Sequence, residues 1–150
     1  MKKYITPEIL QTSMILGGLF LVYRLLRPAS AKEQQQTTTS IKTDIQKEAA
    51  KGEQPSYSDS NYKTLADKLY SAMNTSGTDE SAIFAVFEQM KTKLDILKLV
   101  ESYGVRQLYQ FGIPIGGKQN LAQALSDELS TGEISKVNQI LFKKGINYKF

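Results

Sequence analysis

Residues 59–104 decide the fold, and they read DSNYKTLADKLYSAMNTSGTDESAIFAVFEQMKTKLDILKLVESYG. Apolar residues recur in this stretch every three or four positions, which is the period of one face of an α-helix. Asp59, Thr78 and Thr92 can each cap a helix, because their side-chain oxygens accept hydrogen bonds from the free N–H groups of a first turn. Gly77 precedes the second helix and Gly104 ends the third. The three buried faces are expected to hold Tyr62, Leu65, Ala66, Leu69 and Met73, then Ile83, Phe84, Val86, Phe87 and Met90, then Leu94, Leu97, Val100 and Tyr103.

Two further helices are expected after residue 118. Residues 104–118 contain four glycines and Pro114, which indicate a loop with room for one helical turn at 107–111. A fourth helix follows from the spacing of Leu121, Ala124, Leu125 and Glu128. Ser130 and Glu133 form a capping box for a fifth helix, which is expected to stop at Gly145. The predicted fold class is therefore all-α, with a compact domain of four or five helices over residues 59–150 and one candidate strand at 146–150.

An apolar helix is expected at the N-terminus, within residues 1–28. Thr6 and Pro7 suit the N-cap and the first helical position, and residues 9–23 carry no charge. If the stem of Arg24 reaches toward water, the apolar span extends to Leu26, close to the roughly 20 residues that a membrane span requires. The residues expected to lie in lipid are Met14, Ile15, Leu16, Leu19, Phe20, Leu21 and Val22.

Three interpretations of this segment stay open. The favoured one is an uncleaved single-pass membrane anchor, whose orientation is undecided because basic residues flank both of its ends. The second is a signal peptide cleaved at the small residues Ala29, Ser30 and Ala31. The third is a helix buried among the subunits of an assembly, where Gly17 and Gly18 would allow close helix packing.

Residues 29–58 are expected to form a polar linker between the apolar helix and the domain. They run through QQQTTT and mixed charges, and Ile41 and Ile45 are nearly their only large apolar residues. Such a composition favours a solvated tether, because it offers little apolar surface to bury. Its Lys, Glu, Gln and Ala content also permits a short helix over roughly residues 40–50.

Composition argues against an enzyme. The chain has no His and no Cys, which excludes catalysis by Ser-His-Asp or Cys-His groups and zinc sites built from those ligands. Residues 1–58 carry a net charge of +3 and residues 59–150 only +1, so the domain lacks the basic stripe of a nucleic-acid binder. Lys143, Lys144 and Lys149 are better explained as solvated lysines at a helix end. We therefore expect neither catalysis nor nucleic-acid binding.

Two stretches carry a resemblance to a known family. MNTSGTDESAI, residues 73–83, resembles the first half of an annexin repeat, in which a helix leads through a Gly-Thr-Asp-Glu loop into a second helix. NLAQALSDELSTG, residues 120–132, resembles the later leucine-rich helix and the turn that follows it. The resemblance covers residues 62–141 and implies an annexin-like arrangement of five helices, although annexins carry four or more repeats.

The annexin resemblance also implies a calcium site that binds acidic phospholipid. Carried over to this chain, the backbone carbonyls of Met73, Thr75 and Gly77 and the carboxylate of Glu128 would be the ligands, all of them oxygens that suit a hard cation. Thr75 stands where the family prefers glycine. The same residues also have a purely structural interpretation, in which Thr78 caps a helix and its acidic neighbours complement the helix dipole.

These features predict a non-enzymatic, membrane-tethered structural or interaction protein whose helical domain binds a protein or a lipid headgroup. The alternative is a structural component of a large assembly, such as a virion or a secretion apparatus, with the N-terminal helix buried among other subunits. Phe111, Ile113 and Ile115 form the candidate partner-binding loop, or else fold under to complete the core. No cofactor other than calcium is expected, and association with a protein partner or with further copies of the chain is.

Overall fold

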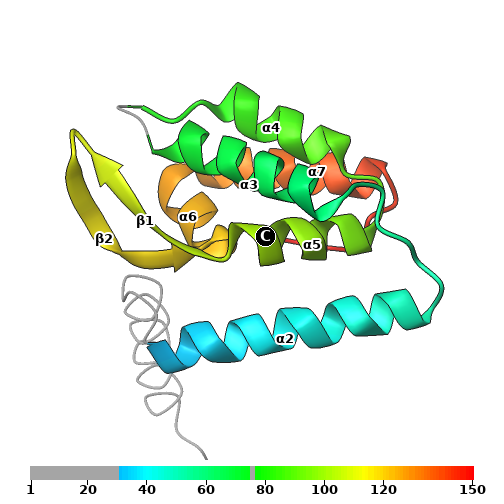
Figure 1. Ribbon diagram of the computed structural model, residues 1–150. Helices are drawn as coiled ribbons and strands as arrows, with labels where there is room; N and C mark the ends of the chain where they lie inside the picture. The colour runs from blue at the N-terminus through cyan, green and yellow to red at the C-terminus, as the bar shows by residue number, and fades with distance from the viewer. Residues whose placement is uncertain (1–30, 75–76) are drawn as a thin grey trace, which may run out of the picture.

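The computed structural model describes residues 31–74 and 77–150, which form a mostly helical domain with one two-stranded hairpin (Figure 1). The elements in chain order are α2 (Ala31–Ala50), α3 (Asp59–Met73), α4 (Glu80–Gln89), α5 (Lys93–Tyr103), β1 (Val105–Gln110), β2 (Ile113–Asn120), α6 (Leu121–Glu128) and α7 (Thr131–Lys143). The expected anchor within residues 1–28 lies outside the described residues. So does nearly all of the alternative signal peptide, whose cleavage site is expected at 29–31.

Side-chain caps explain where the helices begin. Thr92 caps α5 and Ser130 forms a capping box with Glu133 at the start of α7, as the sequence predicts, and Asp95 completes a second capping box with Thr92. Two predicted caps are one residue out of place. α3 is capped by Ser58 rather than by the residue after it, and α4 is capped by Asp79, whose carboxylate accepts a hydrogen bond from Ala82 N.

The core lies between α3, α4, α5, α6 and α7. α3 packs against α4 and α5, and α4 packs against α7. The predicted apolar faces supply most of it, because residues three or four apart on a helix share one face. Fully buried members are Tyr62, Ala66, Leu69, Ile83, Phe87, Met90, Ile96, Leu99, Leu121, Leu125, Val137 and Leu141. Beyond α7, residues 146–150 form no strand, and the Phe150 ring packs on Phe87 at 5.2 Å between ring centroids.

The all-α prediction is wrong at residues 105–120, which form an antiparallel hairpin rather than a loop. The pairing runs from Val105 opposite Asn120 to Gln110 opposite Ile113, with an irregularity in the register between Arg106 and Leu108. Pro114 and the glycines suggested a loop. However, β2 is an edge strand, where a proline costs no ladder hydrogen bond if its nitrogen faces outward.

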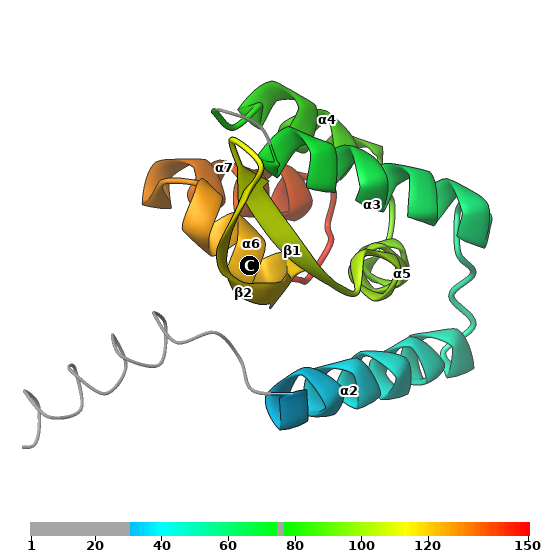
Figure 2. The same cartoon turned by 60° about the vertical axis from the view of Figure 1, so that its left-hand side comes forward.

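The expected solvated tether is also wrong for residues 31–50, because they form the 20-residue helix α2, longer than the short helix considered at 40–50. α2 packs along α5 and forms a separate layer under the domain (Figure 2). α5 has two buried faces. Leu99 and Tyr103 belong to the main core, whereas Leu94 and Leu97 are each 1% exposed and lie roughly half a turn away around the helix. That second face is the one α2 can cover.

Candidate functional site

The clearest unpartnered apolar surface is the end of the hairpin. Phe111 is 80% exposed and Ile113 is 68% exposed, and Tyr109 and Ile115 are also exposed. We call these four side chains the hairpin tip. Among the described residues the only other exposed large apolar side chain is Phe142 on α7. Single exposed apolar residues are ordinary, but Phe111 and Ile113 beside the turn, with Tyr109 and Ile115 further down the two strands, together indicate a contact surface.

The turn at the tip is a tight one with an unusual residue in it. Phe111 and Gly112 connect the two strands, and their φ angles are +52° and +77°. Positive φ at both central positions is the pattern of a type I′ turn, which normally selects Asn or Asp followed by Gly. A bulky side chain in the left-handed region is strained by roughly 1–2 kcal/mol. Phe111 is therefore both strained and exposed, and neither property serves the fold.

The base of the hairpin, in contrast, is held firmly. Leu108 is buried in the core. Arg106 forms an ion pair of 2.7 Å with Asp67 on α3. Tyr70 Oη, also on α3, donates a 2.8 Å hydrogen bond to the carbonyl of Gln107. These contacts fix the direction in which the tip projects.

The loop after α3 lies beside the hairpin. Tyr109 N donates to Asn74 Oδ1 at 2.6 Å, and Thr78 Oγ1 donates to Glu128 Oε2 at 2.8 Å. Glu128, the expected carboxylate ligand for calcium, thus touches the loop that was expected to supply the carbonyls. Thr75 lies outside the described residues. Among the residues described, no three acidic, His or Cys side chains gather around one point, so calcium binding stays a prediction.

A small cavity of about 220 Å³ lies next to Glu128, between the hairpin and α6. Gln119 lines it, donates a hydrogen bond from Nε2 to Asp127, and is 9% exposed. Its Oε1 has no hydrogen-bond partner among the described residues. The cavity has room for water, which would satisfy that oxygen. The sequence does not indicate this cavity, because Gln119 lies between the expected loop at 104–118 and the next expected helix and carries no local signal of its own.

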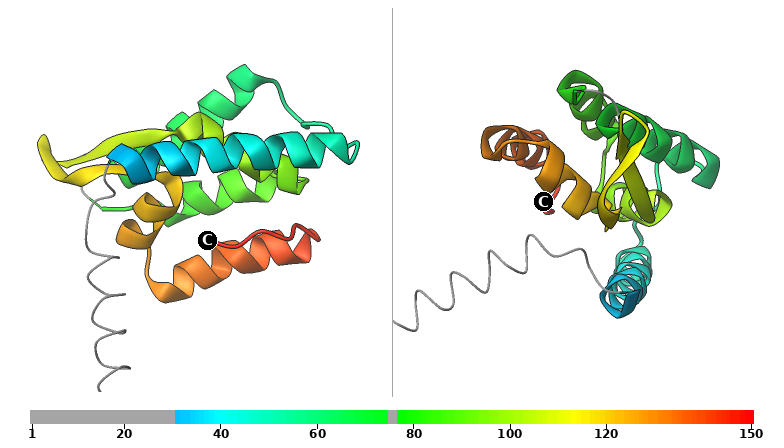
Figure 3. Two further views of the ribbon diagram at one scale, coloured as in Figure 1. Left: turned by 90° about the horizontal axis from the view of Figure 1, so that it is seen from below. Right: turned by 90° about the vertical axis from the view of Figure 1, so that its left-hand side faces the viewer.

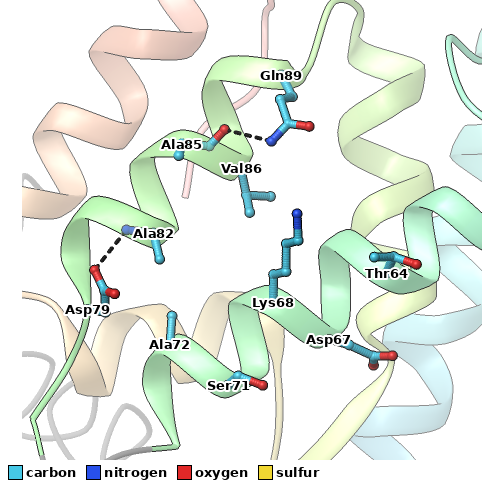
Figure 4. Close-up of a pocket in the computed structure, with 10 residues that line it drawn as sticks. All are labelled: Thr64, Asp67, Lys68, Ser71, Ala72, Asp79, Ala82, Ala85, Val86 and Gln89. Atoms are coloured by element: carbon cyan, nitrogen blue, oxygen red, sulfur yellow. Dashed lines mark hydrogen bonds between the residues drawn. The ribbon is translucent and has the colours of Figure 1, made fainter.

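A larger groove of about 630 Å³ lies along the surface between α3 and α4 (Figure 4). Ala72, Val86 and other small side chains line it, and Lys68 extends into it. Its two carboxylates have structural partners: Asp79 caps α4, and Asp67 points away from the groove and pairs with Arg106. The groove thus offers an apolar floor and one ammonium group.

A buried carboxylate organises the other end of the domain. Asp95 accepts hydrogen bonds from Ser56 N at 2.8 Å, Tyr62 Oη at 2.5 Å and Lys91 N at 2.9 Å. Burial alone would raise the pKa of Asp95, but these hydrogen bonds outweigh it and lower the pKa. Burial, with the adjacent carboxylate, raises the pKa of Tyr62. This network ties the segment before α3 to α5 and is structural.

An ion pair holds α2 on the domain. Lys93 Nζ lies 2.8 Å from Glu48 Oε1, and Lys51 lies 3.0 Å from the other oxygen. The hydrogen bonds from Lys93 and Lys51 lower the pKa of Glu48, and the one to Glu48 raises the pKa of Lys93. Ile41 packs against the core from the same helix. The charged pair and this apolar contact fix where α2 begins relative to the hairpin.

Comparisons with known proteins add no relative. No protein-family model matches the chain, and no curated protein or solved structure matches it. The annexin resemblance therefore rests on the residues quoted for it. Within residues 31–74 and 77–150, no helix has both the length and the apolar character of a membrane span. The expected anchor residues, from Met14 to Val22, lie outside that part of the chain.

Proposed function

We propose that this chain is a non-enzymatic, membrane-tethered interaction protein that binds its partner through the hairpin tip. One observation carries the proposal: the hairpin holds a strained and exposed aromatic residue, Phe111, at its apex while its base is fixed to α3. Residues that break local stability rules in an otherwise consistent fold are candidates for function. In this proposal the expected anchor helix within residues 1–28 attaches the chain to the membrane, and this attachment is the membrane tether.

The non-enzymatic part of the proposal is supported by how the acidic groups are used. Asp95 and Glu133 accept hydrogen bonds from helix N-termini, and Asp67 and Glu48 have cationic partners. Because the sequence has no His or Cys, a general base would have to be an acidic side chain, and these four carboxylates already hold structural hydrogen bonds or ion pairs.

Membrane fractionation of the full chain tests the tether. We expect the protein to remain in the membrane pellet after washes with high salt and with carbonate. Leu19→Lys should release it, because a lysine near the centre of a span costs about 3 kcal/mol and this span is already short. Phe142→Lys adds the same charge at an exposed site on α7 and should leave the protein in the pellet. A wild-type chain recovered in the soluble fraction at full mass would refute the tether, and a soluble form beginning near residue 32 would indicate a signal peptide.

A second candidate is a structural component of a large assembly. The docking of α2 supports it, because a helix held by Glu48 and Lys93 makes a stiff spacer of about 30 Å rather than a loose tether. This candidate predicts that residues 14–26 contact protein. Chemical cross-links from that segment to other subunits in purified particles would favour it over the membrane anchor.

We further propose that the domain is annexin-like and binds calcium at Glu128. The support is the contact between Thr78 and Glu128, which brings together the two motifs of the resemblance. Calcium should raise the melting temperature of the wild-type chain, since a ligand that binds only the folded state stabilises it. Absence of any shift at millimolar calcium would remove this part of the proposal.

A further inference from the structure

We infer that the partner of the hairpin tip is a lipid bilayer: the tip inserts into the same membrane in which residues 9–26 are expected to be anchored. This inference rests on the proposed function and names its partner. Three observations carry it, and each is independent of the annexin resemblance.

The first observation is the chemistry of the hairpin. Residues 105–120 contain no Asp or Glu, and their only charged residues are Arg106 and Lys118. Arg106 is the second residue of β1 and is held at the base of the hairpin by Asp67, away from the tip. The tip itself presents Tyr109, Phe111 and two isoleucines. Tyrosine, which has an apolar ring and a polar hydroxyl, is favoured at the level of lipid headgroups, and phenylalanine is favoured on apolar faces that enter the boundary with the acyl chains.

The second observation is the length of chain between the expected anchor and the domain. Leu26 would end the membrane span, and α2 begins at Ala31. Five residues reach at most about 17 Å even when fully extended. The first turn of α2 must therefore lie close to the membrane surface if the anchor spans it.

The third observation is the direction of the hairpin. The tip projects from the same end of the molecule at which α2 begins, and it reaches beyond that helix start (Figures 1 and 3). A domain held within about 17 Å of the bilayer at Ala31 would thus keep the end that carries the hairpin tip close to the lipid. The fixed base at Gln107 and Arg106 keeps the tip from folding back.

The apolar character of the tip also specifies the kind of lipid. Insertion through apolar contact does not need an anionic membrane surface, so it should proceed into neutral phosphatidylcholine. It should also persist in high salt, because salt screens charge and not apolar burial.

The absence of Trp from the chain makes the test direct. Phe111→Trp places a single fluorophore at the tip, and Phe142→Trp places one at a similarly exposed site on α7. Each full-length variant is reconstituted into phosphatidylcholine vesicles, with and without bromine on the acyl chains. We expect emission from residue 111 to shift to the blue and to lose most of its intensity in brominated vesicles. Emission from residue 142 should do neither.

The outcomes separate this inference from the proposed function. Retention of the chain in carbonate-washed vesicles without quenching at residue 111 would overturn the inference and leave the tether standing. A blue shift at residue 111 without quenching would also overturn it, because protein would then cover the tip. Quenching at residue 111 in a chain that carbonate removes would support insertion and refute the tether. Equal quenching at residues 111 and 142 would overturn the inference, since the tip would then have no preferred contact.

Discussion

Replacing Phe111 by Asn should stabilise the domain, although it removes a large apolar side chain. The reason is the backbone at this residue, where φ is +52° in a turn that selects Asn. Relief of the left-handed strain is worth about 1 kcal/mol, at the low end of the usual cost. Phe111 is 80% exposed, so the lost burial is roughly a fifth of a full Phe side chain, or about 0.5 kcal/mol.

The net prediction for Phe111→Asn is therefore a gain of about 0.5 kcal/mol in the free energy of unfolding, which corresponds to about 2 °C in melting temperature. The assay is thermal and urea unfolding of the full chain in mild detergent, followed by helical circular dichroism. Phe142→Asn is the matched control. Phe142 is about as exposed as Phe111 but lies in helix α7, where Asn is no better a helix former than Phe. Phe142→Asn should therefore give no gain in the free energy of unfolding.

A loss of more than about 1 kcal/mol in Phe111→Asn would refute this reasoning. It would mean that the phenyl ring packs against the domain and that its strain is compensated within the fold. In contrast, a variant that is more stable but no longer contacts the membrane through the tip would show that Phe111 is kept for partner contact and not for stability. The aromatic side chain would then serve a partner at the expense of the fold.

Three further predictions concern the rest of the domain. Asp95→Asn should lower stability by about 2–4 kcal/mol, because an amide cannot accept all the hydrogen bonds that Tyr62 and the neighbouring backbone donate. Because folding lowers the pKa of Asp95, the stability that its carboxylate contributes is complete above the unfolded-state pKa of about 3.9 and is lost as pH falls through the folded-state pKa. The unfolding free energy of the Asp95→Asn variant should therefore depend less on pH in that range than that of the wild-type chain. Lys93→Ala removes the main partner of Glu48, so it should speed amide hydrogen exchange in α2 and leave exchange in α3 to α7 unchanged. Unaltered exchange in α2 would show that the packing of Ile41 is enough to hold the helix on the domain. Glu128→Gln should abolish any rise in melting temperature caused by calcium, and a shift that persists in the variant would place the ion elsewhere.

The helices from α3 onward could be predicted because their signals are local. Thr92 and Ser130 begin helices with capping boxes, and Gly104 ends α5 with a φ of +62°. Each signal depends on residues within one or two turns, so it survives without knowledge of tertiary contacts. The mostly helical fold of the domain follows from these signals.

The hairpin and α2 could not be predicted because their stability comes from distant contacts. Gln107 is held by Tyr70, which lies 37 residues earlier, and Glu48 is held by Lys93, which lies 45 residues later. A Phe-Gly turn lacks the Asn-Gly signature by which hairpins are recognised. Phe111, Ile113 and Ile115 could be named from composition and Tyr109 could not, and the exposure of Phe111 depends on the turn that presents it.

The most direct test of the account asks what touches residue 111 in the native membrane. A photoreactive benzoylphenylalanine, which is Phe with an added benzoyl group, can replace Phe111 because this side chain is 80% exposed, and Phe142 is the control position. Irradiation of the carbonate-washed membrane fraction, followed by mass analysis of the 16.8 kDa chain, reports the contact. The account predicts an adduct heavier by one phospholipid at residue 111 and none at residue 142. A discrete adduct between residue 111 and another protein, with no lipid adduct, would contradict it.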